Sequence, residues 1–206
     1  MELSRKSLYA LSLAMTVVFT FGGWLYITYL TDHTIFEALS RGFPLKEQLA
    51  VGAAIGVLVG VAFSVAVFMI PWFEALREKA REIVNAVRPR WYDLVVLSLA
   101  AGWGEEILFR GALQPVVGIW IASLLFAAAH GMLNFRSKGQ IAYTVFLFLA
   151  GFGLGLVYEW AGLVASMTLH AVYDFAGLTT LVLFTNRRGK DGGENVRDEE
   201  GEETMP

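Results

Sequence analysis

Residues 92–113 read YDLVVLSLAAGWGEEILFRGAL, an apolar run of 22 residues that also holds Glu105, Glu106 and Arg110. A transmembrane helix needs about 20 consecutive, mostly apolar residues. A charged side chain near the bilayer centre costs about 2.5–3.5 kcal/mol on insertion scales, so such groups persist where they pair with one another or line an internal cavity. This stretch therefore predicts a membrane helix whose charged side chains face the interior of a helical bundle.

The composition of the whole chain agrees with a membrane protein. It is 56% hydrophobic and 17% charged, whereas soluble domains carry about 25% charged residues. We therefore predict an all-α, polytopic membrane helical bundle of about six transmembrane helices. The six stretches that reach membrane length are roughly 7–30, 49–73, 92–113, 115–131, 141–158 and 162–184.

The chain divides into one membrane domain and a tail. We expect a single membrane domain over 1–184, and a disordered, acidic cytoplasmic tail over 185–206, which is rich in Gly, Glu and Asp and lacks hydrophobic periodicity. Between the second and third stretches lies EALREKAREIVNAVRPRW, with apolar residues at helical spacing. It predicts an interfacial amphipathic helix that ends at Pro89.

The basic residues predict the orientation. Thirteen of the 16 Lys and Arg residues fall in segments on one side of the six predicted spans, against Arg41 and Lys46 on the other side and Arg110 within a span. Because cytoplasmic loops carry the excess of Lys and Arg, both termini are predicted to be cytoplasmic. The charge pattern indicates no nucleic-acid partner, and the absence of cysteine excludes disulfides and thiolate metal sites.

Small residues at helical spacing predict close packing of the helices. Gly52, Gly56 and Gly60 form two overlapping GxxxG repeats in the second stretch, and Gly151 and Gly155 repeat the spacing in the fifth. We interpret them as contacts within one bundle and favour this over a dimer interface. The oligomeric state stays open.

Polar side chains recur in three of the predicted spans. Glu106 and Arg110 are four residues apart, so they share a helix face and can pair. His170 and Asp174 have the same spacing, which lets both contact one metal ion, water or oxyanion. Within the remaining span, Phe126 precedes His130 by one turn and is expected to pack beside it.

These motifs resemble the CAAX prenyl protease and bacteriocin-processing family, which includes the type II CAAX endopeptidases. That family shows EExxxR, then FxxxH, then HxxxN or HxxxD, each within a membrane helix. The corresponding residues here run from Glu105 to Arg110, from Phe126 to His130 and from His170 to Asp174. The resemblance covers about residues 92–180, the predicted catalytic core.

The resemblance implies an intramembrane endopeptidase that hydrolyses a membrane-embedded or prenylated, CAAX-type substrate with activated water. It implies that Glu105 is the general base, that His130 helps to hold the water, and that Glu106 is the structural partner of Arg110. His170 and Asp174 would be metal ligands or would stabilise the oxyanion. An ionised Asp174 accepts hydrogen bonds but cannot donate one, whereas it can bind a cation. We therefore lean towards zinc, held by Glu105, His130, His170 and Asp174.

Two other classes of function stay open. The first is a non-catalytic immunity or scaffold protein in which the buried groups stabilise the bundle. The second is a proton- or cation-coupled carrier that uses them as a relay. The small size favours a prokaryotic plasma-membrane protein whose partners are the lipid bilayer and a lipidated or membrane-embedded substrate.

The predicted spans contain one geometric conflict. Counted along straight helices at 1.5 Å per residue, Glu105 and His130 lie at depths that differ by roughly 10 Å. We therefore predict an irregular helix at Gly102-Trp103-Gly104, and expect Gly104 to let another backbone approach.

Overall fold

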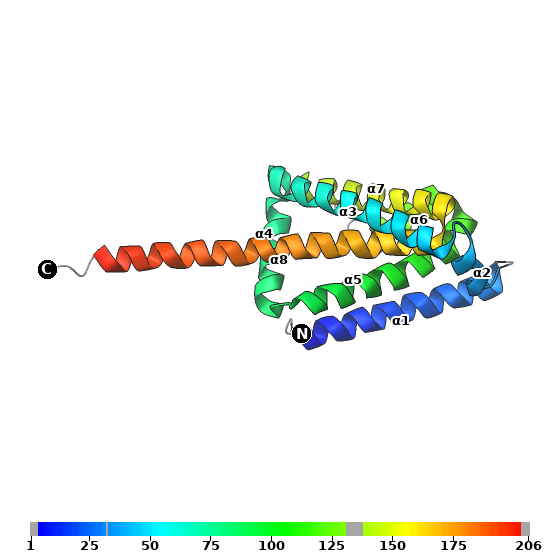
Figure 1. Ribbon diagram of the computed structural model, residues 1–206, viewed down its shortest axis with the longest axis horizontal. Helices are drawn as coiled ribbons and strands as arrows, with labels where there is room; N and C mark the ends of the chain where they lie inside the picture. Colours follow the sequence, from blue (N-terminus) through cyan, green and yellow to red (C-terminus); the bar gives the residue numbers. More distant parts are fainter. Residues whose placement is uncertain (1–3, 32, 131–137, 203–206) are drawn as a thin grey trace.

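The computed structural model describes residues 4–31, 33–130 and 138–202, with side chains described as far as Thr185 except those of Ala75 and Leu76. The described residues form helices and no strands, which confirms the all-α class (Figure 1). In chain order the helices are α1 (Arg5–Leu30), α2 (Ile35–Ser40), α3 (Leu45–Met69), η1 (Pro71–Phe73), α4 (Glu74–Val87), α5 (Trp91–Glu106), η2 (Ile107–Leu113), α6 (Gln114–Ala129), α7 (Lys138–Ala161) and α8 (Leu163–Glu202).

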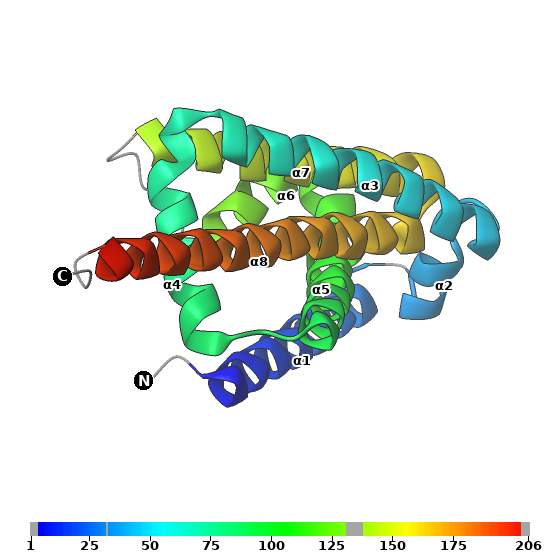
Figure 2. The same ribbon diagram turned by 60° about the vertical axis from the view of Figure 1, so that its left-hand side comes forward.

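Helix α8 lies in the middle of the bundle. Helices α3 and α7 pack on one side of it and α5 on the other, with α1 outside α5 (Figures 1 and 2). Helix α4 crosses one end of the bundle, nearly at right angles to α8. The start of α1 and the C-terminal part of α8 leave the bundle at this same end.

The bundle is apolar on the outside and has small residues at its tightest contact. Large apolar side chains such as Leu13, Leu58 and Trp120 are exposed, as expected for a surface that lies in lipid. The glycines at 52, 56 and 60 instead face α8, where a Cβ atom at position 56 would stand 2.8 Å from the Cβ of Val172. The interpretation of these GxxxG repeats as contacts within the bundle is confirmed.

The third and fourth predicted stretches form one helical run. Five runs are long and apolar enough to cross a membrane, and the third of them is Trp91–Ala129, 39 residues in length. It contains the π-helix η2, and it is broken at Gly118, whose φ of 79° lies in the left-handed region. Against about six predicted spans, the structure has five such runs, and the third run joins two helices across the break at Gly118. The part after the break, residues 119–129, extends only about 16 Å at 1.5 Å per residue, half of a 30 Å hydrocarbon core.

Helix α4 has the amphipathic character that its sequence predicts. Val84, Val87 and the preceding Phe73 are buried against the bundle, while charged side chains such as Glu78 and Lys79 are exposed. The helix ends at Val87 and Arg88 adopts a left-handed conformation, because a residue before proline is disfavoured in the helical region. Its place at the membrane interface stays a prediction.

Helices α1 and α5 are joined at their shared end by Asp93. This buried carboxylate accepts hydrogen bonds from Arg5 at 2.8 Å, from the Tyr9 hydroxyl at 2.5 Å and from the backbone of Arg90 at 2.6 Å. At the other terminus, α8 continues as helix to Glu202, into the segment for which the sequence predicts an unstructured acidic tail. The side chains of this segment and residues 203–206 lie outside the described part of the chain.

Candidate active site

The two adjacent glutamates lie at the junction of α5 and the π-helix η2. The α-helix is regular through Glu106, and the π-helical turns begin at Ile107, so the predicted irregularity at 102–104 is wrong in position. Single π-helical turns occur frequently at functional sites. Gly104 does allow a close approach, since a Cβ atom there would stand 3.0 Å from the Cα of Thr16 in α1.

The break at Gly118 brings His130 level with Glu105. Gly118 lies 13 residues after Glu105 and 12 residues before His130, so a reversal of the chain at this glycine places the two at nearly the same depth. The Glu105 Oε2 and His130 Nε2 atoms are 3.5 Å apart. The conflict between straight helices is therefore resolved, and the expectation that the two residues share a site is met.

Glu106 belongs to a fully buried network on the interior side of the site. Its Oε1 atom is 2.8 Å from Nδ1 of His170, and its Oε2 atom accepts a hydrogen bond of 2.5 Å from the Ser166 hydroxyl. The Arg110 Nε atom is 3.4 Å from the same carboxylate, so the pair predicted from the i, i+4 spacing is present. Arg110 also donates to the Gly151 carbonyl at 2.8 Å, and its guanidinium lies over the Phe126 ring at 4.7 Å.

Aromatic rings fix the two histidines. Phe126 packs beside His130 with ring centres 4.6 Å apart, as the sequence predicts, and its edge meets His170 at 5.9 Å. Tyr173 stacks parallel to His170 at 5.1 Å. Because these rings are held between packed neighbours, the free nitrogen of each imidazole has a defined direction.

The hydrogen bonds also assign the tautomers. His130 Nδ1 is 2.8 Å from the Phe126 carbonyl and His170 Nδ1 faces a carboxylate; both partners can only accept, so each Nδ1 carries a proton. In the neutral rings each Nε2 is then an acceptor. The two Nε2 atoms face Glu105 Oε2 at 3.5 and 4.0 Å, and His170 Nε2 faces Asp174 Oδ2 at 3.6 Å. Four acceptors thus surround one space, an arrangement that suits a water molecule, a proton or a cation.

The donor set meets the geometry of zinc only in part. Tetrahedral zinc with bonds of about 2.0–2.2 Å holds its donor atoms roughly 3.3–3.6 Å apart. The distances of 3.5 and 3.6 Å lie in this range, whereas 4.0 Å between Glu105 and His170 does not. Within the described ranges, no three His, Asp or Glu side chains form a metal cluster. Zinc therefore stays a prediction, checked by metal analysis of the purified protein, and no step below passes through it.

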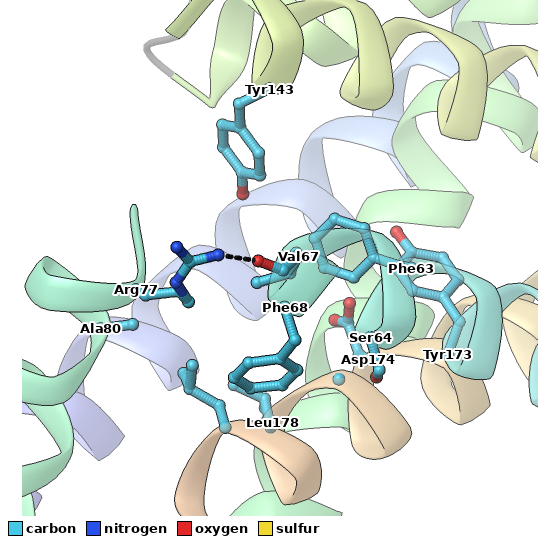
Figure 3. Close-up of a pocket in the computed structure, with 12 residues that line it drawn as sticks. Phe63, Ser64, Val67, Phe68, Arg77, Ala80, Tyr143, Tyr173, Asp174 and Leu178 are labelled. Atoms are coloured by element: carbon cyan, nitrogen blue, oxygen red, sulfur yellow. Dashed lines mark hydrogen bonds between the residues drawn. The ribbon is translucent and has the colours of Figure 1, made fainter. Parts of the chain in front are cut away.

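Two cavities each include one of these carboxylate residues in their lining. One of about 190 Å³ lies between α1 and α5 and is lined by Glu105 together with Thr16 and Phe19. The other, of about 200 Å³, lies among α3, α4, α7 and α8 and is lined by Asp174 together with Tyr173 (Figure 3). Glu105 and Asp174 thus each border a cavity.

The site contains residues that the sequence alone does not single out. Ser166 is one such residue, since one serine in an apolar helix is common and its contact with Glu106 crosses between α8 and α5. Gly118 is another, because an isolated glycine in an apolar run does not indicate that the chain reverses its direction there. For Gly151, the GxxxG spacing predicts packing but not the hydrogen bond that its carbonyl accepts from Arg110.

Comparison with known proteins finds a family model that matches part of the chain. Residues 87–176, which include all six predicted site residues, match the family model described as type II CAAX prenyl endopeptidase Rce1-like. The matched segment comprises 90 of the 206 residues and is similar to that family. The five apolar runs, together with this similarity, make the chain an integral membrane protein.

A curated relative covers part of the same region. "Uncharacterized protein YpbD" from Bacillus subtilis (strain 168) is 37% identical over 108 residues, which are 52% of this chain and 54% of the relative. The chain thus spans about half the length of this curated relative. No solved structure matches the chain.

Proposed function

We propose that this chain is an endopeptidase that hydrolyses a peptide bond of a membrane-embedded or lipidated, CAAX-type substrate. The observation that carries this proposal is the convergence of acceptor atoms from Glu105, His130, His170 and Asp174 inside an apolar bundle. Ionisable groups at membrane depth are costly and rare, and four of them around one space indicate a functional site. The Rce1-like segment supports the same conclusion.

In the proposed reaction Glu105 is the general base. A water molecule held by Glu105 and His130 loses a proton to Glu105 while its oxygen attacks the carbonyl carbon of the scissile bond. The C–N bond then breaks, the departing amine takes the proton from Glu105, and the new carboxylic acid ionises in water. A positioned base of this kind contributes about 10²–10⁴-fold to a rate.

The remaining groups position the reacting residues and stabilise the charges that develop during the reaction. Glu106 holds His170 through Nδ1; His170 Nε2 is an acceptor in the neutral ring, so it must first take up a proton from solvent before it can donate to the developing oxyanion. Asp174, 3.6 Å from that nitrogen, stabilises the imidazolium. Arg110 offsets the buried charge of Glu106 and does not contact substrate, so both are positioning residues.

The orientation is part of the proposal. The start of α1 and the C-terminal part of α8 lie at the α4 end of the bundle, and thirteen of the 16 basic residues fall in segments assigned to one side. We place this end in the cytoplasm of a prokaryotic cell, with the bundle in the plasma membrane. Since the chain has no cysteine, one introduced at Lys6 is a unique site for a membrane-impermeant thiol reagent, and labelling of intact cells there would contradict the orientation.

The test of the activity uses the full chain in liposomes with a farnesylated CAAX peptide, read by mass spectrometry. We expect cleavage by the native protein and by Glu82→Gln, a change of an exposed carboxylate on α4, but not by Glu105→Gln. An unchanged cellular phenotype of folded Glu105→Gln would instead favour the scaffold function. Proton or cation uptake that requires Glu105, without cleavage, would favour the carrier.

A further inference from the structure

The reactive space is bordered by hydrogen-bond acceptors. Glu105 Oε2, Asp174 Oδ2 and the Nε2 atoms of the neutral rings of His130 and His170 face it. An oxyanion that develops on a carbonyl is stabilised by N–H or O–H donors placed close to it. A histidine can donate from Nε2 here only after it has taken up a second proton, so these four residues include no permanent donor.

The cavity that Asp174 lines contains other polar groups. Its polar lining side chains are those of Ser64, Arg77, Tyr143, Tyr173 and Asp174 (Figure 3). The Ser64 hydroxyl already donates to the Gly60 carbonyl at 2.7 Å. Arg77 donates to the carbonyl oxygens of Val67 and Ile70. An ionised carboxylate only accepts, so two tyrosine hydroxyls remain as candidate donors.

Tyr173 is held by its contact with His170. The two rings stack in parallel with their centres 5.1 Å apart, and Tyr173 is buried. Because Tyr173 and Asp174 are neighbours on α8, their side chains leave this helix about 100° apart. Turning the Tyr173 ring towards Asp174 would break the stack that orients the imidazole. Its role is therefore to position His170.

Tyr143 approaches the cavity from a different helix. It lies on α7, and its half-buried side chain points into the cavity (Figure 3). Its ring stacks on Phe146 at 6.3 Å, and Phe146 stacks on Phe63 of the cavity wall at 3.9 Å. The ring is thus supported, whereas the hydroxyl forms no hydrogen bond with the residues that the structure describes. The charges of Asp174 and Glu105 both act on this hydroxyl, which places it near both carboxylates.

Resting on the proposed function, we infer that the Tyr143 hydroxyl donates a hydrogen bond to the oxyanion that forms on the scissile carbonyl. The water held by Glu105 attacks the carbonyl carbon, and the carbonyl oxygen, directed away from Glu105, meets the hydroxyl from α7. The tyrosine keeps its proton throughout, so the water proton still passes through Glu105 to the departing amine. Tyr143 is thus a catalytic residue that contacts the reacting oxygen.

The variant Tyr143→Phe removes the donor and keeps the ring with its stack on Phe146. In liposomes with the farnesylated CAAX peptide, we expect kcat to fall about 10²–10³-fold, the effect of losing one oxyanion donor. KM and the midpoint of thermal unfolding should stay near their native values. Tyr158→Phe is the matched control, because it makes the same change on the same helix at a residue that lines a cavity beside α2. It should keep the native kcat.

A second measurement separates oxyanion binding from a structural role. A peptide in which a phosphinate replaces the scissile bond mimics the tetrahedral oxyanion and is not cleaved. Because a transition-state analogue reports interactions that are made only in the transition state, its inhibition constant for Tyr143→Phe should rise by about the factor by which kcat/KM falls. A structural role would instead raise KM for the substrate together with the inhibition constant.

The outcomes distinguish the inference from the proposed function. A native kcat in Tyr143→Phe, or a loss that appears only as a higher KM, would overturn the inference alone. The same holds if the loss of phosphinate binding appears in Tyr173→Phe and not in Tyr143→Phe. Absence of peptide cleavage by the native protein would overturn the proposed function and the inference with it.

Discussion

The two sides of His170 differ in how far their polar groups are exposed, although each side holds buried polar atoms without a hydrogen-bond partner among the described residues, Nε and Nη1 of Arg110 on the interior side. On the interior side, the side chains of Glu106 and Arg110 keep 0% and 1% of their surface exposed, and Ser166 completes a closed network. On the other side, the side chains of Glu105 and His130 keep 17% and 30%, and Glu105 Oε2 has no hydrogen-bond partner within the described ranges. Adjacent glutamates thus have opposite environments: the closed side holds the geometry and the open side is free to bind water.

The sharpest test of this difference is Glu105→Gln. It removes the base but no hydrogen bond, so we expect a loss of about 10²–10⁴-fold in kcat with a nearly unchanged midpoint of thermal unfolding. Peptide cleavage and unfolding in the same detergent measure both. A drop in the unfolding midpoint as large as that of Glu106→Gln would contradict the division of roles.

Glu106→Gln changes the closed side. It leaves the buried Arg110 without its counter-charge, and breaking a buried pair costs about 3–5 kcal/mol. We expect this loss in the free energy of unfolding, measured by denaturant titration in micelles. Glu159→Gln, a carboxylate that only accepts from Gln114 at 3.0 Å, is the matched control and should change stability much less.

Ser166→Ala removes the hydrogen bond to Glu106 and leaves the ion pair of Glu106 with Arg110 in place. The hydroxyl donates to Glu106 and lies 3.1 Å from the Leu154 carbonyl, and a hydrogen bond to a charged group contributes about 1.5–3 kcal/mol. We expect a loss of stability in this range together with a moderate fall in kcat, because Glu106 then holds His170 less firmly. An unchanged kcat would show that His170 does not depend on this support.

Gly118→Ala is the mildest of the four changes. The φ of 79° with a ψ of 163° is unfavourable for a residue with a Cβ atom, at about 1–3 kcal/mol, while the added atom would meet nothing within 4 Å. The effect is therefore one of backbone conformation alone. If the reversal aligns His130 with Glu105, kcat falls in parallel with the loss of stability; Gly22→Ala, also without neighbours within 4 Å but inside a regular helix, should have no such effect.

The sequence predicts the residues of the site better than the course of the chain that brings them together. Glu105, His130, His170 and Asp174 are predictable because ionisable groups are rare at membrane depth and their spacing is helical. The break at Gly118 is not predictable in this way. Its positive φ can be inferred only from the need to bring Glu105 and His130 to the same depth in the membrane. The close contact between Glu106 and His170 is also missed, since the i, i+4 rule finds Arg110 first and says nothing of partners on another helix.

The contact of α3 with α8 has a consequence for the surrounding lipid. Gly52 and Gly60 bring these helices so close that a methyl group at either position would collide with α8. This close packing prevents one helix from sliding along the other. His170 and Asp174 therefore keep a fixed height within the bundle. When bilayer thickness changes, the whole bundle must tilt or the lipid must deform. If the proposed function holds, the thickness of the surrounding membrane decides which bond of an embedded substrate lies at the height of Glu105.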